Sequence, residues 1–197
     1  MTSSATPGIR RRRAAILAAD VVGYSSLMSE DEEGTLVLIK RLRREVIEPK
    51  VKKHHGRIFK TTGDGFLIEF AIPAEAVHCA VETQQCLAYE AARGPLRALQ
   101  LRIGINLSDI IVEEDGDVYG DGVNVAARLQ RMADPSGICI SARVYDEIRD
   151  TLPYRFEDWG EQRVKNIPRP LRVYCFAGTT KRPGGALFAP CAMCISA

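Results

Sequence analysis

The most constraining feature of this sequence is the order in which its hydrophobic patterns follow one another. Short apolar runs, typical of buried strands, alternate with stretches in which apolar residues recur every three or four positions, as on one buried helix face. Leu36, Ile39 and Leu42 show the helical spacing, whereas residues 99–107 show a period of two. The segments are, in chain order, a strand at 14–22, a helix around 36–46, strands at 56–60 and 66–70, a helix from 73 to about 92, and a strand at 99–107. This order predicts a ferredoxin-like βαββαβ core.

The second half of the chain adds a C-terminal strand and helix extension to that core. A helix is predicted from Gly120 to about Met132, followed by short strands around one small helix. These strands are predicted at 137–140, 154–159 and 171–176. Because helices and mostly antiparallel strands are mixed along the chain, the predicted fold class is α+β.

The length of 197 residues is that of one domain with short tails. We expect residues 1–13 to form a disordered basic flank and residues 14–178 to form the folded domain. Residues 179–197 form a mildly apolar tail whose role the sequence does not indicate.

Charge and hydropathy argue against several function classes. The net charge of +2 is too small to favour a nucleic-acid partner, and the four arginines at 10–13 are expected to be solvated. No run approaches the ~18 consecutive apolar residues of a membrane span. The N-terminus has no apolar run behind a basic one, which argues against a secretory signal.

The six cysteines favour a reduced, cytoplasmic setting. Four of them lie in apolar periodic segments, where cysteine acts as a small hydrophobic residue. These four are Cys79, Cys86, Cys139 and Cys175. Cys191 and Cys194 form a single C-x-x-C pair in the tail, which is weak evidence for zinc without a second pair.

Two carboxylates give the first sign of chemistry. Asp20 ends the first predicted strand, and Asp64 lies in the glycine-rich turn 61–65 of a predicted hairpin. The antiparallel hairpin would bring Asp64 to the sheet edge of Asp20. Two such carboxylates can hold a pair of Mg²⁺ or Mn²⁺ ions and leave room for phosphate oxygens. The alternative is that both aspartates only cap turns.

A second polar pair lies on the helix after Tyr119. Asn124 and Arg128 are four residues apart, so they project from one helix face. An amide can hold a sugar oxygen, and a guanidinium can hold a phosphate. By spacing alone, an exposed polar helix face is the favoured explanation of the pair.

Three motifs together resemble those of class III nucleotidyl cyclases. Residues 19–25 (ADVVGYS) look like the first metal-binding motif, and residues 60–65 (KTTGDG) look like the second. Residues 117–128 (DVYGDGVNVAAR) are similar to the third motif in order and spacing. The resemblance extends over about residues 14 to 177 and implies the class III cyclase fold.

The resemblance implies roles for the residues of the first two motifs. Asp20 and Asp64 would be metal ligands, with the Val21 carbonyl completing one of two divalent metal sites. The backbone of the next segment would line the triphosphate, with the Ser25 hydroxyl as an additional donor. That segment consists of Gly23, Tyr24 and Ser25.

The remaining roles follow from the third motif and two lysines. Lys60 and Asp117 resemble the family's purine-selecting pair, and a Lys/Asp pair implies ATP. Asp117 can accept from the adenine amino group and Lys60 can donate to N1, whereas guanine reverses that pattern and leaves buried groups unpaired. Asn124 would orient the ribose, and Arg128 would stabilise charge on the α-phosphate. Lys165 resembles a lysine that reaches the terminal phosphates.

The resemblance implies an adenylate cyclase that forms 3′,5′-cyclic AMP and pyrophosphate from ATP as a homodimer with shared active sites. The alternatives are a guanylate cyclase, a non-catalytic nucleotide-binding module, and a polymerase-type enzyme with the same two-metal logic. No protein general base is evident. His54 and His55 are assigned to the exposed end of a helix and not to the site.

Overall fold

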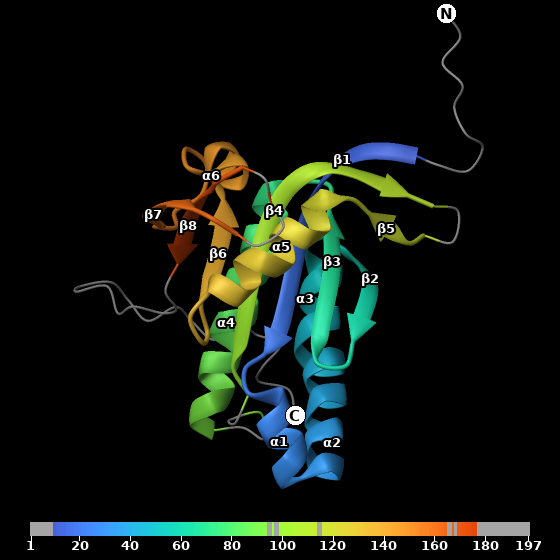
Figure 1. Ribbon diagram of the computed structural model, residues 1–197. Coiled ribbons are helices and arrows are strands. Elements are labelled where there is room, and N and C mark those ends of the chain that lie inside the picture. Colours follow the sequence, from blue (N-terminus) through green and yellow to red (C-terminus); the bar gives the residue numbers. More distant parts are fainter. Residues whose placement is uncertain are drawn as a thin grey trace, which may run out of the picture.

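The computed structural model describes residues 10–93, 96, 99–113, 116–164, 167 and 169–176. Its strands are β1 (Arg10–Val21), β2 (Arg57–Thr62), β3 (Gly65–Phe70), β4 (Leu101–Val112), β5 (Val118–Tyr119), β6 (Ile138–Ser141), β7 (Glu157–Gln162) and β8 (Leu171–Phe176). They form one sheet in the order β2-β3-β1-β4-β6-β8-β7, and β5 pairs with the far end of β4 (Figure 1). The β4–β6 pair is parallel and the other described pairs are antiparallel.

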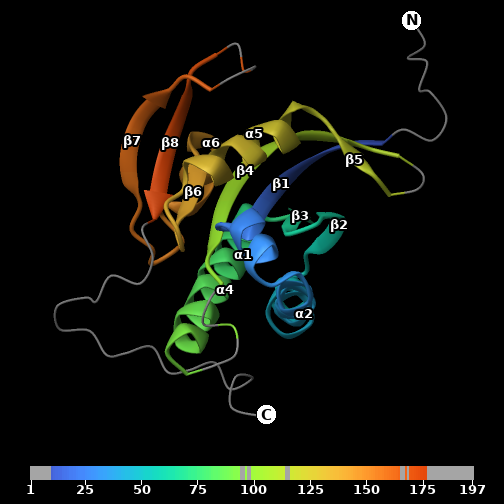
Figure 2. The same cartoon turned by 60° about the horizontal axis from the view of Figure 1, so that its bottom comes forward.

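Helices cover both faces of the sheet. They are α1 (Tyr24–Glu30), α2 (Glu32–Leu42), the π-helical turn η1 (Arg43–Ile47), α3 (Glu48–Lys53), α4 (Pro73–Arg93), α5 (Asp121–Met132) and α6 (Ala142–Ile148). Figure 2 shows α5 on one side of β1 and β4, with α2 and α4 on the other side. The larger apolar core lies on the α2 and α4 side and includes Leu42, Val77 and Ile103. Smaller clusters lie beneath α5.

The predicted βαββαβ order and the C-terminal extension are confirmed. The start of β1 differs from the expectation, because this strand begins at Arg10 and not at Ala14. The reason is that β4 continues to Val112, so Arg10 finds a backbone partner opposite it. Residues 1–9 and 177–197 lie outside the described residues, as do Cys191 and Cys194.

The predicted first helix is divided into several pieces. Asp31 ends α1 and caps α2, where its side chain accepts a hydrogen bond from the Gly34 backbone N–H at 2.9 Å. After α2 the chain continues through the π-helical turn η1 directly into α3. Pro49 lies in the first turn of α3, where a missing N–H costs least.

The cysteine prediction is correct for one pair and wrong for the other. Cys79 and Cys86 are buried thiols on α4. Cys139 and Cys175 instead form a disulfide, because they lie directly opposite each other on β6 and β8. Within the described ranges, no helix is long and apolar enough to cross a bilayer.

Candidate active site

Asp20 and Asp64 meet at the end of β1. The antiparallel register pairs Ala19 with Phe66, so the β2–β3 turn that carries Asp64 lies beside the last residues of β1. Burial raises the pKa of Asp64, and the negative charge of Asp20 raises it further, against the opposing effect of the Asp64 and Val21 backbone N–H groups and Arg102. The two carboxylates are therefore close enough to repel each other, as the sequence predicted.

Arg102 is a site residue that the sequence analysis missed. It lies on β4 directly opposite Asp20. Its Nε and Nη2 donate to Asp20 Oδ1, and its Nη2 also donates to Oδ2, each at 3.3 Å. Both side chains are about one-third exposed or less. The available signal was a charged residue within a strand of otherwise alternating apolar residues, but only the strand register shows which acid it faces.

The segment after β1 begins the short helix α1. Gly23 has φ of 70° and caps the start of α1, and open space surrounds the position of a Cβ there. The first turn of any helix leaves backbone N–H groups available, and Tyr24 and Ser25 are the first residues of this one. The Tyr24 ring points toward the β2–β3 turn, since a Cβ on Gly63 would lie 3.9 Å from it. Ser25 is exposed.

Close packing against β4 determines the position of α5. A Cβ on Gly104 would lie 2.1 Å from the Gln130 nitrogen, so only glycine allows the helix this near to the sheet. The Asn106 side chain also donates to the Gly122 carbonyl at 3.2 Å and holds the first turn of α5. The buried side of α5 contains Ala126 and Leu129. Asn124 is exposed and Arg128 is half-buried, both outside that buried set.

A contact of Arg57 links the strand that carries Lys60 to the loop before Asp117. Lys60 is exposed on β2. Arg57, on the same strand, donates to the Gly116 carbonyl at 2.8 Å and so holds the loop just before Asp117 against β2. The Asp117 carboxylate accepts from the Tyr119 hydroxyl at 3.3 Å.

The arrangement separates Asp117 from the carboxylate pair. Asp20 lies opposite Arg102 near the start of β4, whereas Val118 lies opposite Val112 at its end. Ten residues of strand correspond to roughly 30 Å along β4. Asp117 and Asp20 of one chain therefore lie near opposite ends of the central strand β4.

The donor set at the end of β1 fits hard divalent cations. Asp20 and Asp64 are two carboxylates of like charge that lie close together, and the Arg102 guanidinium forms an ion pair with Asp20. Within that part of the chain, no three His, Cys, Asp or Glu side chains converge on one point. Ions held here would therefore also need backbone oxygens, such as the Val21 carbonyl, and oxygens from a substrate.

His54 lies at the end of α3 as expected, but it is buried and not exposed, because its Nδ1 lies 2.7 Å from Glu75 Oε2. His54 therefore belongs to an internal polar cluster, whereas His55 is exposed. Lys165 lies outside the described residues.

Comparisons with known proteins identify the family of this chain. Residues 9–178 match the family described as "Adenylate and Guanylate cyclase catalytic domain". A Rhizobium meliloti protein named "Putative adenylate cyclase 3" is 49% identical over 176 residues, which cover 88% of this chain and 30% of that protein. This chain thus spans less than a third of that relative.

Solved structures show the same fold. The adenylate/guanylate cyclase/hydrolase from Silicibacter pomeroyi has a TM-score of 0.80 and 44% identity, over 87% of this chain and 99% of that one. The adenylyl cyclase CyaB from P. aeruginosa has a TM-score of 0.77 at 23% identity, over 90% and 99% of the two chains, and supports the fold alone. The chain belongs to the adenylate and guanylate cyclase catalytic domain family.

Proposed function

We propose that this domain converts ATP to 3′,5′-cyclic AMP and pyrophosphate as a homodimer with shared active sites. The observation that carries the proposal is the meeting of Asp20, Asp64 and Arg102 at the end of β1. Two acids and one guanidinium form a site for a metal-bound triphosphate. We place this activity in the cytoplasm, where ATP is available.

The metal ions would be held by Asp20, Asp64 and the Val21 carbonyl. When bound, two such ions supply charge neutralisation for the triphosphate and lower the pKa of the ribose 3′ hydroxyl. Arg102 contacts both oxygens of the Asp20 carboxylate, so it would compete with a metal ion for them. We propose that the Arg102 guanidinium then turns from Asp20 to the phosphate oxygens, which offer it the same paired acceptors.

The protein side chains would orient the nucleotide for an internal displacement. The ribose 3′ hydroxyl gives its proton to solvent as its oxygen attacks the α-phosphorus, the bond from the α-phosphorus to the bridging oxygen of the β-phosphate breaks, and pyrophosphate leaves. Asn124 holds the ribose and Arg128 stabilises the charge that develops on the α-phosphate oxygens. The backbone of Gly23, Tyr24 and Ser25 lines the triphosphate, and Lys165 reaches its terminal phosphates.

Base selection is assigned to Lys60 and Asp117. Asp117 would accept from the adenine amino group, and Lys60 would donate to N1. With GTP, each mismatched polar group that is left unpaired costs ~1–3 kcal/mol. The Arg57 contact to Gly116 supports this assignment, because it holds the Asp117 loop beside the strand of Lys60.

The separation along β4 supports the dimer. Asp117 and Asp20 of one chain lie roughly 30 Å apart along the strand, too far to contact one nucleotide. A two-fold axis would bring the Asp20 end of one subunit to the Asp117 end of the other and would create two equivalent sites. Partly exposed apolar side chains beside α5, among them Phe59, Leu67 and Val123, offer a surface for this contact.

The experiment is a product assay. Purified protein is incubated with ATP or with GTP, in the presence of Mg²⁺ or Mn²⁺, and the products are identified by mass. Cyclic AMP with pyrophosphate supports the proposal. Cyclic GMP in excess over cyclic AMP would assign a guanylate cyclase, and no product in any mixture, from protein that binds nucleotide, would assign a binding module.

A further inference from the structure

The disulfide between Cys139 and Cys175 links the central sheet to its outer hairpin. It joins β6 and β8. The two cysteines are 36 positions apart in the sequence, and their Cα atoms are 4.1 Å apart. Both cysteines are at most 5% exposed. By contrast, burial raises the pKa of the Cys79 thiol to about 12, so that group is nearly inert toward thiol chemistry.

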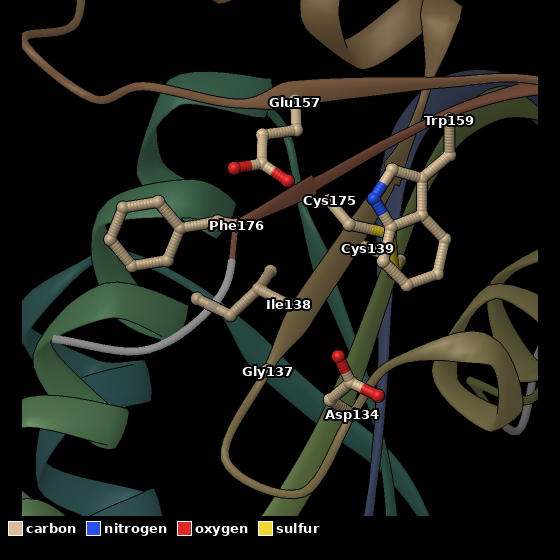
Figure 3. A pocket seen from close by; sticks show the side chains of 8 residues that line it. All are labelled: Asp134, Gly137, Ile138, Cys139, Glu157, Trp159, Cys175 and Phe176. Carbon is tan, nitrogen blue, oxygen red and sulfur yellow. A yellow bond between two sulfur atoms is a disulfide. The ribbon is translucent and has the colours of Figure 1, made fainter. Parts of the chain in front are cut away.

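The disulfide lies beside a small cavity close to the edge of the sheet. The sulfur atoms lie at a cavity of about 10 Å³, which has room for about one water molecule. Figure 3 shows the Trp159 indole beside the bond, with Glu157 on the same strand nearby. Trp159 lies on the edge strand β7, where the pairing with β8 shifts register between Asp158 and Glu161. Local opening of this irregular edge would expose the sulfurs to a reductant.

The disulfide also lies beneath the helix of the proposed active site. Its two cysteines share an apolar cluster with Leu129 and Ala133 at the C-terminal end of α5. Cys139 is paired with Gly104, the residue on which the α5 backbone rests. A change in the β6–β8 spacing would therefore act directly on the surface that supports α5.

We propose that Cys139–Cys175 is a thiol–disulfide exchange site for a dithiol reductant, and that its reduction loosens α5 and slows turnover. A thiolate of the reductant attacks one sulfur, the Cys–Cys bond breaks, and a mixed disulfide forms. The second thiol of the reductant then displaces the protein sulfur. Two electrons pass from the reductant, which leaves as a disulfide, and the two protein sulfurs end as thiols. Only the expected effect on turnover rests on the cyclase activity proposed above.

The test uses the full chain in a Cys191→Ser/Cys194→Ser background, so that the tail cannot exchange. The protein is treated with dithiothreitol without denaturant and is then reoxidised with oxidised glutathione. Alkylation with peptide mass mapping counts the new thiols. Emission of Trp159, the only tryptophan in the chain, reports the bond separately, because a disulfide quenches a neighbouring indole. Hydrogen exchange of residues 121–132 reports α5 without any activity.

We expect alkylation of Cys139 and Cys175 only after reduction, a reversible rise in tryptophan emission, and about tenfold faster exchange of the α5 amides. Turnover should fall about tenfold, within the ~100-fold that a 1 Å misplacement of a catalytic group can cost. A Cys139→Ala/Cys175→Ala variant should resemble the reduced protein. The matched control, Cys79→Ala/Cys86→Ala, should keep the full response.

Two results would overturn the proposal. One is a bond that stays oxidised in the native protein under excess dithiothreitol, or that never forms. The other is full, reversible reduction with unchanged exchange of α5. If neither redox state makes a cyclic nucleotide, the proposed cyclase function is wrong. Thiol counting and hydrogen exchange then still show whether Cys139–Cys175 is an exchange site.

Discussion

Arg102 lies opposite Asp20 across the β1–β4 pair, and its guanidinium contacts both carboxylate oxygens at 3.3 Å. This pairing occupies the carboxylate that the proposed reaction needs for a cation. Arg102 and the metal therefore compete for Asp20, whereas Arg102 and the metal cooperate on a triphosphate. The same side chain should have opposite effects on metal binding and on substrate binding.

Replacement of Arg102 with Ala separates these effects. Without nucleotide, Mn²⁺ should bind about two- to fivefold more tightly, which corresponds to the ~0.5–1 kcal/mol of a partly exposed ion pair. With ATP, kcat/KM should fall about 10- to 100-fold, since a charge-assisted hydrogen bond is worth ~1.5–3 kcal/mol. Calorimetric Mn²⁺ titration and steady-state kinetics measure the two changes.

The control for this variant is Arg155→Ala, which removes an exposed arginine far from the pair in sequence. It should leave both measurements unchanged. Equal Mn²⁺ affinity in the wild type and the Arg102→Ala protein would show that the guanidinium does not compete for Asp20.

Asp64 should destabilise the metal-free fold. Burial and then the charge of Asp20 raise its pKa, so folding disfavours the ionised carboxyl. The folded state therefore loses stability as pH rises from the ordinary carboxyl pKa through the raised one, and the loss is complete above it. At pH 7 in EDTA, Asp64→Asn should raise Tm by about 1–3 °C, as a fraction of 1 kcal/mol does in a domain of this size.

The pH series tests the cause of that change. The Tm advantage of Asp64→Asn should disappear below the ordinary pKa of an aspartate, where both proteins are uncharged at residue 64. The variant should also lose detectable turnover, because a neutral amide replaces a metal-binding carboxylate. A lower Tm than the wild type at pH 7, measured by calorimetry, would contradict the prediction.

Several parts of the fold could be read from the sequence because local rules decide them. Period-two and helical spacings located the six core elements, and the hairpin turn with Gly63 and Gly65 placed Asp64 near Asp20. The start of β1 could not be read locally. Residues Arg10 and Arg11 have no apolar alternation, and they form strand only because β4 extends to Val112 on the other side of the pair.

The missed site features all depend on contacts between distant segments. Arg102 and Asp20 are 82 positions apart, and Cys139 and Cys175 are 36 apart. A one-residue change of register would turn each pair to opposite faces. His54 was assigned to a surface because the sequence shows a helix end, but its burial comes from the facing helix α4, which carries Glu75 and Glu82.

Base preference should change when the residues at 60 and 117 are exchanged for others. The double variant Lys60→Glu/Asp117→Ser removes the donor to adenine N1 and the acceptor for its amino group, and it supplies a carboxylate for guanine N1–H. The ATP/GTP ratio of kcat/KM should fall by about 10- to 100-fold, from one or two hydrogen bonds at ~1–3 kcal/mol. Competition assays with both nucleotides measure the ratio directly.

The control is Lys52→Glu, which changes an exposed lysine on α3. It should leave the ratio unaltered. Full retention of the ATP preference by the folded double variant would mean that Lys60 and Asp117 do not read the base.

The shared-site dimer makes the most demanding prediction, because it concerns two defective chains that repair each other. Asp64 and Arg128 should act on one nucleotide from different subunits, so Asp64→Ala and Arg128→Ala should each be nearly inactive alone. In a heterodimer of the two, one site carries both lesions and the other carries neither. Random mixing at equal amounts makes half of the dimers mixed, so about a quarter of the wild-type activity per chain should return. Dilution below the dimer dissociation constant should remove that activity again. Differently tagged chains, purified through both tags, establish that mixed dimers exist. If these purified heterodimers are no more active than either parent, Asp64 and Arg128 do not meet across a subunit interface.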